Sequence, residues 1–410
     1  MGGILKKIFS GTAVYILCHK VYLWILDIPE YILSAIFFLF PVDEGKVLFT
    51  SYFGKQLGDN PKYIYEELLK KTNKVKILWV FDKKCMPKSI PDNISFCYLG
   101  TFKYLYHLHT AVVVVDNCRK KWFFKKKNQL YIQTWHGGGG QKKCEKDVEA
   151  KLPLSYVQKA KQDSKNIDLM ISDSKFTTKL YHNSFWYSGP ILECGFPRYD
   201  ILLKNNSDIR EKVYSYYNIP LDFKLVLYAP TFRVDNSFDA YNIDMYRILN
   251  ALEKRFESKF VFLIHLHPNV ANNESGITYD GERVINSTFY PDTQELIAVS
   301  HVLIGDYSSI NYDFCLRRLP VFRYAADLEK YKEDRDFYIP YDSFPFPSAA
   351  NNDQLEQEIL NFDEQNYLKE LNKFFDLVGQ VSETNASAKI SDVIIEYCGN
   401  PNKKYLISKL

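Results

Sequence analysis

The sequence predicts an α/β protein of two Rossmann-like units that face a cleft, preceded by an apolar helical segment. Three observations lead to this prediction. Val- and Ile-rich runs alternate with helical patterns, which is typical of parallel sheets covered on both faces. The alternation restarts after a polar stretch at residues 204–208, and each half has the length of one domain. The first 44 residues carry apolar stretches of their own.

The composition is that of an ordinary globular protein and excludes several other classes. The 410 residues are 46% hydrophobic and 25% charged, unlike a disordered or fibrous chain. A net charge of +3 does not indicate nucleic-acid binding. The eight cysteines include no C-x-x-C pair, which argues against structural zinc and disulfides and favours the reducing cytoplasm.

Two apolar stretches, 13–18 and 31–40, lie within residues 1–44. Neither reaches the roughly 20 apolar residues that a membrane-spanning helix needs. No small-residue cleavage site follows the first stretch, so we do not expect a secretory signal peptide. Two interpretations stay open: helices that pack on the core, or an interfacial membrane-associating segment whose basic end, Lys6 and Lys7, meets lipid headgroups.

The first unit is predicted over residues 45–218. Its short apolar runs fit buried strands, while Pro61 fits the first turn of a helix and Ser174 opens another. The expected strands are 47–52, 74–81, 111–116, 130–135 and 167–172, and the expected helices are 61–71, 102–109, 153–164 and one from Ser174.

The second unit is predicted over residues 219–360, followed by C-terminal helices over 361–410 that pack back across both units. Its pattern repeats that of the first unit. The expected strands are 224–230, 260–267, 283–286, 301–306 and 320–324, and the expected helices are 240–256, 293–298 and 308–316.

Three polar segments follow predicted strands, at the sheet edge where ligands bind in open α/β folds. The first is Q-T-W-H-G-G-G-G at 133–140, the second is I-H-L-H-P-N at 264–269, and the third is L-I-G-D-Y-S-S at 303–309. A run of four glycines is costly to order, because glycine loses the most conformational entropy on folding. The run therefore indicates a loop whose backbone comes close to a ligand.

The histidines and the arginine in these segments suit a reaction at phosphate. His136, beside the glycines, suits a general base, because a near-neutral pKa allows it to deprotonate a hydroxyl group. His267 suits an electrophilic role beside a phosphoryl oxygen. The segment Y-A-P-T-F-R adds Thr231 and Arg233, and a guanidinium matches phosphate geometry.

Two functions are open for the D-Y-S-S segment. Ser308 and Ser309 can cap the helix that follows them, which stabilises a helix by about 1 kcal/mol. Together with Asp306, they can instead bind a phosphate or a ribose through hydroxyl and backbone N–H groups.

The ordered set of motifs resembles the CDP-glycerol glycerophosphotransferase family, the teichoic-acid primases and polymerases. The resemblance covers residues ~45 to ~340, a two-domain length. It implies a GT-B-like fold and a cytoplasmic enzyme peripheral to the membrane. The motifs are S-Y-F-G-K-Q-L-G-D-N-P-K-Y-I-Y, Y-I-Q-T-W-H-G, G-F-P-R-Y-D, L-Y-A-P-T-F-R, L-H-P, D-Y-S-S-I-N-Y-D-F and D-L-E-K-Y.

The resemblance also implies a reaction and its partners. An alditol phosphate, glycerol phosphate first among the candidates, passes from a CDP-alditol to a hydroxyl group of a membrane-linked glycan or polyol-phosphate acceptor. CMP is released, and the product belongs to teichoic acid or to a phosphate-containing capsule. The resemblance does not distinguish a primase from a polymerase.

Site residues follow from the matching motif positions. His136 and His267 take catalytic positions, and the implied substrate-binding residues are Gly137, Gly138, Arg198, Thr231, Arg233, Asp306, Ser308 and Ser309. The chain departs from many members after W-H-G, where they have Thr-Pro and this chain has glycines. That departure leaves the donor and acceptor less determined than the reaction type.

Other functions remain as alternatives. A GT-B glycosyltransferase that uses a nucleotide sugar would have the same two-unit form. A membrane-attached module that binds polyanions would use the basic segment 119–127, which we predict to be a solvated loop. We expect no cofactor, no essential metal and no nucleic-acid partner, and D-R-D at 334–336 is predicted to be a charged loop. The oligomeric state, including a homo-oligomer, stays open.

Overall fold

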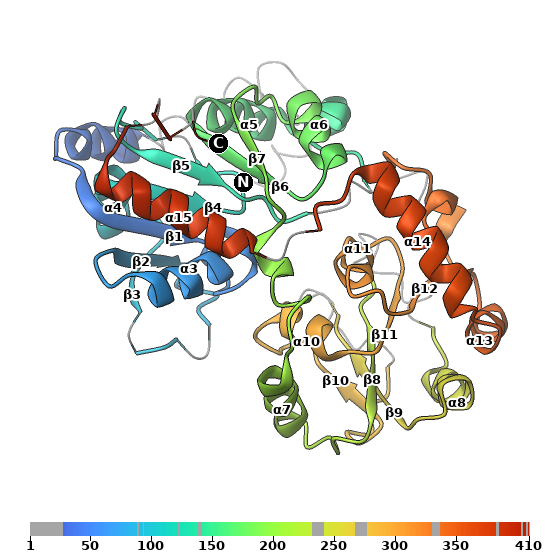
Figure 1. The fold of residues 1–410 in the computed structure, drawn as a ribbon. Helices are drawn as coiled ribbons and strands as arrows, with labels where there is room; N and C mark the ends of the chain where they lie inside the picture. The colour runs from blue at the N-terminus through green and yellow to red at the C-terminus, as the bar shows by residue number, and fades with distance from the viewer. Residues whose placement is uncertain are drawn as a thin grey trace, which may run out of the picture.

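Two separate parallel sheets, of seven and six strands, organise the part of the chain that the structure describes (Figure 1). This arrangement confirms the predicted α/β class with two parallel-sheet units. The domain boundaries predicted from the sequence stay a prediction. The computed structural model describes residues 28–87, 90–92, 94–121, 123–137, 142–231, 242–266, 277–329, 337–382, 385–402, 405–406 and 409.

The first sheet has the strand order β3-β2-β1-β4-β5-β6-β7, and all its neighbours pair in parallel. The order reverses between β1 and β4, so a crevice forms beyond the carboxyl ends of these two strands, where ligands bind in such sheets. The strands are β1 (Asp43–Thr50), β2 (Lys76–Phe81), β3 (Ser95–Tyr98), β4 (Ala111–Asp116), β5 (Leu130–Gln133), β6 (Leu169–Ser172) and β7 (Ile191–Glu193).

The second sheet has the order β10-β9-β8-β11-β12-β13 and is also parallel throughout. Its order reverses between β8 and β11, which places a second ligand crevice beyond those strands. The strands are β8 (Lys224–Tyr228), β9 (Phe260–Ile264), β10 (Val284–Asn286), β11 (Val302–Gly305), β12 (Val321–Tyr324) and β13 (Ser348–Ala349).

Helices cover both sheets and bury their apolar faces against continuous apolar strands, as in β4, where every residue is buried. Thr101 and Ser174 cap their helices through the side chain, as helix-forming sequences favour. The helices are α3 (Asp59–Lys71), α4 (Phe102–Thr110), α5 (Leu154–Asn166), α6 (Lys175–Ser184), α7 (Ser207–Tyr216), α8 (Met245–Phe256), α10 (Thr293–Val299), α11 (Ile310–Cys315), α13 (Asn352–Leu360), α14 (Glu364–Val378) and α15 (Ala386–Gly399).

The strands that the sequence pattern does not predict are the short ones, β3, β7 and β13. They have four, three and two residues. Each lies at an edge of its sheet and has at most one buried residue, so it lacks the continuous apolar run that marks the inner strands.

The last helices return from the second unit to the first. The backbone N–H of Lys175, at the start of α6, donates to Gly379 O, just after α14, at 3.0 Å. Helix α15 then crosses the first unit (Figure 1), where Ser391 Oγ donates to Ile64 O of α3 at 3.3 Å. The chain therefore passes between the units twice, once in each direction.

The N-terminal apolar segment is described only from residue 28, and residues 28–38 are helical. Leu33 and Phe37 pack against the core, whereas Ile32, Ile36 and Leu39 are exposed. None of the described helices combines the length and the apolar character that crossing a membrane requires.

The prediction of a solvated basic loop at 119–127 is wrong for its first two charged residues, Arg119 and Lys120. Arg119 is buried and pairs with Glu145 and Asp163, and buried Lys120 pairs with Asp116. The carboxylates that neutralise Arg119 come from residues 26 and 44 positions later in the chain. The local sequence cannot show such partners, and a segment with these buried pairs is not a free polyanion-binding surface.

Candidate active site

His136 lies beyond the carboxyl end of β5, beside the crevice that the reversal of strand order creates in the first sheet. Its ring contacts residues that follow β1 and β4, the two strands on either side of the reversal. The Tyr52 ring centroid lies 5.5 Å from the His136 ring, and Asn117 holds the imidazole from the β4 side. The structure thus places the predicted base where the fold favours a ligand.

The hydrogen bond at Nδ1 defines which nitrogen of His136 can accept a proton. Nδ1 lies 2.6 Å from the carbonyl oxygen of Asn117, which can only accept, so Nδ1 carries the hydrogen. Nε2 then has the free lone pair. Burial lowers the pKa of His136 below its ordinary value, so the imidazole is neutral at neutral pH. A half-buried, neutral imidazole with this tautomer is suited to general-base catalysis.

Strained backbone gathers around His136. Trp135 has a positive φ of 53°, and its indole stacks on the imidazole with ring centroids 4.5 Å apart. Tyr52 and Phe53, after β1, and Asp59, the first residue of α3, also have positive φ values, between 44° and 59°. Non-glycine residues pay about 1–3 kcal/mol each for such conformations, and they cluster at functional sites.

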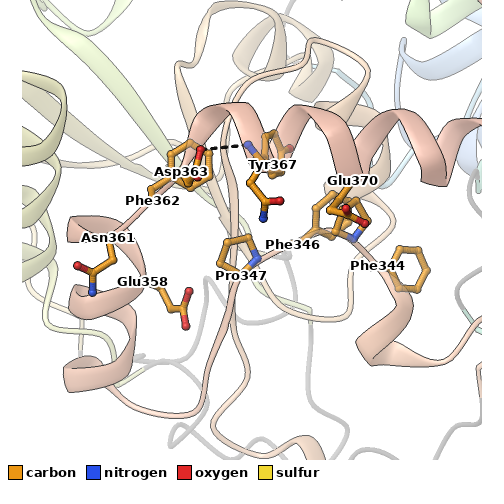
Figure 2. Close-up of a pocket in the computed structure, with 11 residues that line it drawn as sticks. Phe344, Phe346, Pro347, Glu358, Asn361, Phe362, Asp363, Tyr367 and Glu370 are labelled. Carbon is orange, nitrogen blue, oxygen red and sulfur yellow. Dashed lines mark hydrogen bonds between the residues drawn. The ribbon is translucent and has the colours of Figure 1, made fainter.

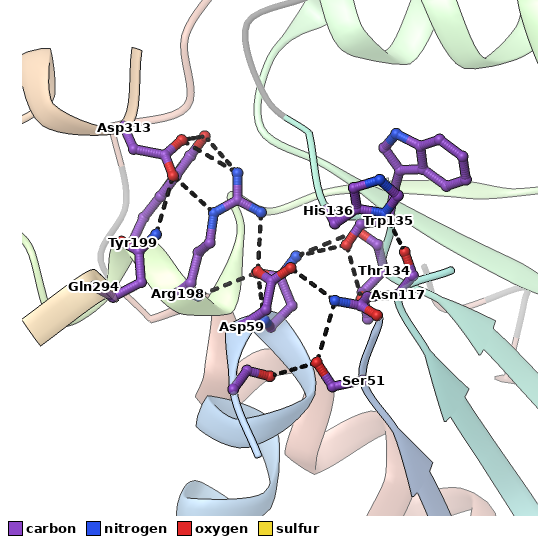
Figure 3. Close-up of polar contacts among 12 residues, drawn as sticks. Ser51, Asp59, Asn117, Thr134, Trp135, His136, Arg198, Tyr199, Gln294 and Asp313 are labelled. Carbon is purple, nitrogen blue, oxygen red and sulfur yellow. Dashed lines mark hydrogen bonds and ion pairs between the residues drawn. The ribbon is translucent and has the colours of Figure 1, made fainter. Parts of the chain in front are cut away.

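Three residues that the sequence analysis missed hold this arrangement together (Figure 3). Asn117 Nδ2 donates to Asp59 Oδ2 at 2.8 Å, and its Oδ1 accepts from the backbone N–H of Tyr52. Asn60 Nδ2 donates to Trp135 O at 3.1 Å. Two features of the sequence could have identified them. Asn117 directly follows the buried strand V-V-V-V-D, and Asp59 and Asn60 directly precede Pro61, where the sequence predicts the start of a helix.

Arg198, one of the predicted substrate-binding residues, is only 2% exposed in the segment that joins the two units. Its Nη1 donates to Asp59 of α3 at 3.1 Å. Its Nε and Nη2 donate to the two oxygens of Asp313 in α11, at 3.0 and 3.2 Å. The guanidinium therefore bridges carboxylates of both units (Figure 3).

Asp306 and Thr231 meet at the reversal of strand order in the second sheet, after β11 and β8. Asp306 is 1% exposed, and its carboxylate accepts from the Thr231 backbone N–H at 2.8 Å and from Thr231 Oγ1 at 2.7 Å. Asp306 Oδ1 also accepts from the N–H of Tyr307. The two predicted donor-binding loops are thus joined to each other at the second ligand crevice.

Ser308 and Ser309 precede α11 at this crevice. In the part of the chain that the structure describes, the Ser309 side chain makes no capping hydrogen bond, and Ser308 Oγ lies 3.4 Å from the N–H of Ile310. A bond of that length is weak. Capping therefore does not account for Ser309, and a ligand-binding function of the two hydroxyl groups stays a prediction.

The remaining predicted site residues divide into two groups. Gly137 lies in the described part of the chain, directly after His136, and is half-buried. His265, which directly follows β9 and precedes the H-P motif, uses both ring nitrogens within the protein, with Ser287 O at 2.8 Å and Thr293 Oγ1 at 3.0 Å. The predicted residues outside the described part are Gly138, Arg233 and His267, and the D-R-D segment at 334–336 also lies outside it.

A cavity of about 610 Å³ opens at the carboxyl ends of β12 and β13, next to the D-Y-S-S segment. Asp327 and Tyr341 line it. Asp327 accepts a hydrogen bond from Tyr307 Oη at 2.9 Å, and the Tyr341 and Tyr307 rings lie 5.7 Å apart. The cavity thus adjoins the predicted donor phosphate site.

A second cavity, of about 370 Å³, lies between α13, α14 and the segment 344–347 (Figure 2). Glu358, Asp363 and Glu370 line it together with aromatic rings. Three carboxylates repel an anionic diphosphate, so this cavity does not suit the donor. Within the described residues, no group of three or more His, Cys, Asp or Glu side chains is arranged to hold a metal ion.

Comparisons with known proteins agree with this geometry. Residues 32–396 match the model of the CDP-glycerol:poly(glycerophosphate) glycerophosphotransferase family. A teichoic acid poly(glycerol phosphate) polymerase of Staphylococcus epidermidis is 30% identical over 85% of this chain, and the chain spans 50% of that relative's length. A teichoic acid ribitol-phosphate primase of Bacillus spizizenii is 29% identical over 88% of this chain and 93% of its own.

A solved structure also resembles this chain over most of its length. It is the wall teichoic acid polymerase TagF, with a TM-score of 0.79 and 28% identity, and the match covers 93% of this chain and 97% of that one. The likeness therefore includes both sheets rather than one of them.

Proposed function

Because this chain belongs to the CDP-glycerol:poly(glycerophosphate) glycerophosphotransferase family, we propose that it transfers glycerol phosphate from CDP-glycerol to a hydroxyl group of a membrane-linked acceptor. The family and the enzyme class predicted from the motifs are confirmed. The proposed product is a teichoic acid or a phosphate-containing capsule polymer. The ribitol-phosphate primase is 29% identical, so identity alone does not select the alditol.

The single observation that carries this proposal is the state of His136. Its Nδ1 is held by the Asn117 carbonyl oxygen, so Nε2 can accept a proton. A transfer to a hydroxyl group needs such a base, because the nucleophile loses its proton as it attacks. A protein that only binds polyanions has no need for a neutral, half-buried and oriented imidazole.

In the proposed reaction, the acceptor oxygen attacks the β-phosphorus of CDP-glycerol, the phosphorus that carries the glycerol. A new P–O bond forms to the acceptor, the P–O bond to CMP breaks, and the acceptor proton passes to His136 Nε2. CMP leaves with the electron pair of the broken bond. Ser308 and Ser309 are proposed to donate to the donor phosphates and to stabilise the charge that develops there. His267, Arg233 and Gly138 remain proposed members of this site by their motif positions.

We assign the cavity at the ends of β12 and β13 to the nucleoside of the donor. Its position beside Tyr307 supports this assignment, because the nucleoside must lie within one diphosphate length of the serines that bind the phosphates. Asp327 and Tyr341 offer a hydrogen-bond acceptor and an aromatic face for a ribose and a base.

A donor panel tests the function. Purified protein is incubated with acceptor-loaded vesicles and, in separate reactions, CDP-glycerol, CDP-ribitol and a UDP-sugar, and nucleotide release is measured. We expect CMP from CDP-glycerol and no UDP. Release of UDP without CMP would instead assign the chain to the glycosyltransferases. Release of CMP from CDP-ribitol alone would show that the transferred group is ribitol phosphate.

The exposed apolar residues of the N-terminal helix support peripheral attachment to the cytoplasmic face of a membrane. Ile32, Ile36 and Leu39 are 56%, 47% and 83% exposed, while Leu33 and Phe37 on the other side pack against the core. An apolar strip that a folded protein leaves in water marks a site of interaction with a lipid or a protein surface. The acceptor is membrane-linked in the proposed reaction, so a lipid surface is the partner that this function requires.

Single charged substitutions test the attachment without removing the helix. Leu39→Glu should reduce flotation with anionic vesicles, because a carboxylate opposes insertion into a lipid interface. Leu377→Glu, at a position on α14 that is 73% exposed, serves as the control and should float like the wild type. Equal flotation of both variants would show that the helix is not the anchor.

A further inference from the structure

The cluster around Arg198 is a group of buried charges that joins the two units in the described residues. The guanidinium contacts Asp59 at 3.1 Å and Asp313 at 3.0 Å, and all three side chains are at most 7% exposed. Asp313 also accepts from Tyr199 Oη at 2.9 Å and from Gln294 Nε2 at 3.1 Å. The charged groups of the cluster are thus each in contact with a group of opposite charge.

In the first unit, hydrogen bonds connect the cluster to the proposed base, His136. Asp59 Oδ2 accepts from Asn117 Nδ2 at 2.8 Å, and the Asn117 carbonyl oxygen holds His136 Nδ1 at 2.6 Å. A second connection runs through the main chain: the Arg198 N–H donates to Asn60 Oδ1, and Asn60 Nδ2 donates to Trp135 O. Figure 3 shows the first connection, from Arg198 through Asp59 and Asn117 to the imidazole.

On the other side, the cluster leads to the donor-binding segment. Asp313 lies on α11, which begins one residue after Ser309 and has only six residues. Asn311, on the same helix, donates to Asp306 O at 3.1 Å and packs directly on Gly305. A displacement of Asp313 therefore moves the serines and the loop that contains Asp306.

Stability alone does not explain this cluster. Two carboxylates and one guanidinium leave a net negative charge in a buried place, and removing charges from water costs several kcal/mol per ion. Apolar side chains of the same volume would hold two domains together as well or better. A guanidinium, in contrast, offers N–H groups in fixed directions and so defines the distance and the angle between two carboxylates.

We propose that Arg198 is a positioning residue of the transfer reaction, which sets the place of His136 in the first unit relative to Ser308 and Ser309 in the second. It acts through Asp59 and Asn117 toward the base and through Asp313 toward the donor. The expected effect of Arg198 on kcat rests on the proposed function. It differs from the substrate-binding function that the motif suggests, because the guanidinium is occupied by two carboxylates of the protein.

Arg198→Lys is the informative variant, because it keeps the charge and removes the fork that holds both carboxylates. We expect kcat to fall by about 10²-fold, since a misplacement near 1 Å has that effect on oriented groups. The Kd of CDP-glycerol should stay within about threefold of the wild type. Arg247→Lys is the matched control: Arg247 also pairs with two carboxylates, Asp353 and Glu356, between α8 and α13, and its kcat should be unchanged.

A double-mutant cycle with His136→Ala separates positioning from a general loss of structure. If Arg198 acts through the base, Arg198→Lys should lower the residual single-turnover rate of the His136→Ala protein by less than about threefold, because groups that act as a unit are not additive. Multiplicative losses would overturn the proposal. A raised donor Kd with unchanged kcat would also overturn it and would make Arg198 a donor ligand.

A spectroscopic measurement tests the same connection independently of turnover. In protein labelled with ¹⁵N-histidine, the ring signal of His136, identified by its loss in His136→Ala, reports the Nδ1 hydrogen bond. Arg198→Lys should shift or broaden that signal, and Arg247→Lys should not. An unchanged signal in Arg198→Lys refutes the positioning role, whereas a wild-type protein that releases no CMP from CDP-glycerol refutes only the proposed function.

Discussion

Replacing Ser308 and Ser309 by alanine should weaken donor binding and leave the fold almost as stable as before. In the described residues, Ser309 makes no capping bond and Ser308 makes a long one of 3.4 Å, so little helix stability is lost. Each hydroxyl that donates to a phosphate contributes about 1.5–3 kcal/mol to binding. Each single substitution should therefore raise the Kd of CDP-glycerol by about 10- to 150-fold.

The measurement pairs titration calorimetry with a thermal melt. A lost N-cap costs about 1 kcal/mol and lowers the melting temperature of a domain of this size by about 2–4 °C. Ser174→Ala provides that reference, because Ser174 Oγ accepts from the N–H of Thr177 at 3.1 Å and caps α6. We expect Ser174→Ala to melt earlier with unchanged donor affinity, and the double variant Ser308→Ala with Ser309→Ala to show the opposite pattern.

The reasoning fails if the double variant melts as early as the cap variant and binds CDP-glycerol like the wild type. That result would return both serines to the structural function that short helices commonly require.

Three further predictions concern the base and the second crevice. His136→Ala should lower turnover by about 10²–10⁴-fold and leave donor affinity nearly unchanged. The wild-type kcat/KM should fall with decreasing pH only below pH 6.5, because burial lowers the pKa of His136 from that value and the base works when neutral. A loss of kcat/KM that begins above pH 7 as the pH is lowered would contradict this assignment. Gly305→Ala places a Cβ 1.9 Å from Asn311 Oδ1, so overpacking should cost about 1–3 kcal/mol and weaken donor binding, whereas Gly399→Ala, with no atom within 4 Å of its added Cβ, should not. Equal melting temperatures of the two glycine variants would contradict the predicted clash.

The places of the functional segments could be predicted because parallel sheets impose them. Each strand of such a sheet ends at the same edge, so polar residues after apolar runs gather there whatever the rest of the chain does. His136 after β5, Thr231 after β8 and Asp306 after β11 follow this rule. The strands β3, β7 and β13 have no recognisable apolar run, so the sequence does not predict them.

The partners of the charged residues could not be predicted, because they come from distant parts of the chain. Arg198 lies 139 residues from Asp59 and 115 from Asp313. In the sequence it stands within a family motif, where a ligand for phosphate is the simplest interpretation of an arginine. Only the fold brings the two carboxylates to it, and the same is true of Arg119 with its buried partners.

A transferase of this form has to bring a base and a donor site from two separate sheets into one reaction geometry. Each sheet offers a crevice where its strand order reverses, but nothing in either sheet sets the distance between the crevices. Apolar surfaces would hold the units together without defining that distance, since they attract in no particular direction. The chain instead passes from the first unit to the second through Pro197–Tyr199, the segment that carries Arg198. The direction of its N–H groups then relates Asp59, beside the base, to Asp313, on the helix after the donor-binding serines. The contacts of Arg198 with the two carboxylates therefore add little to the stability of the fold, but they define the position of the base relative to the donor site.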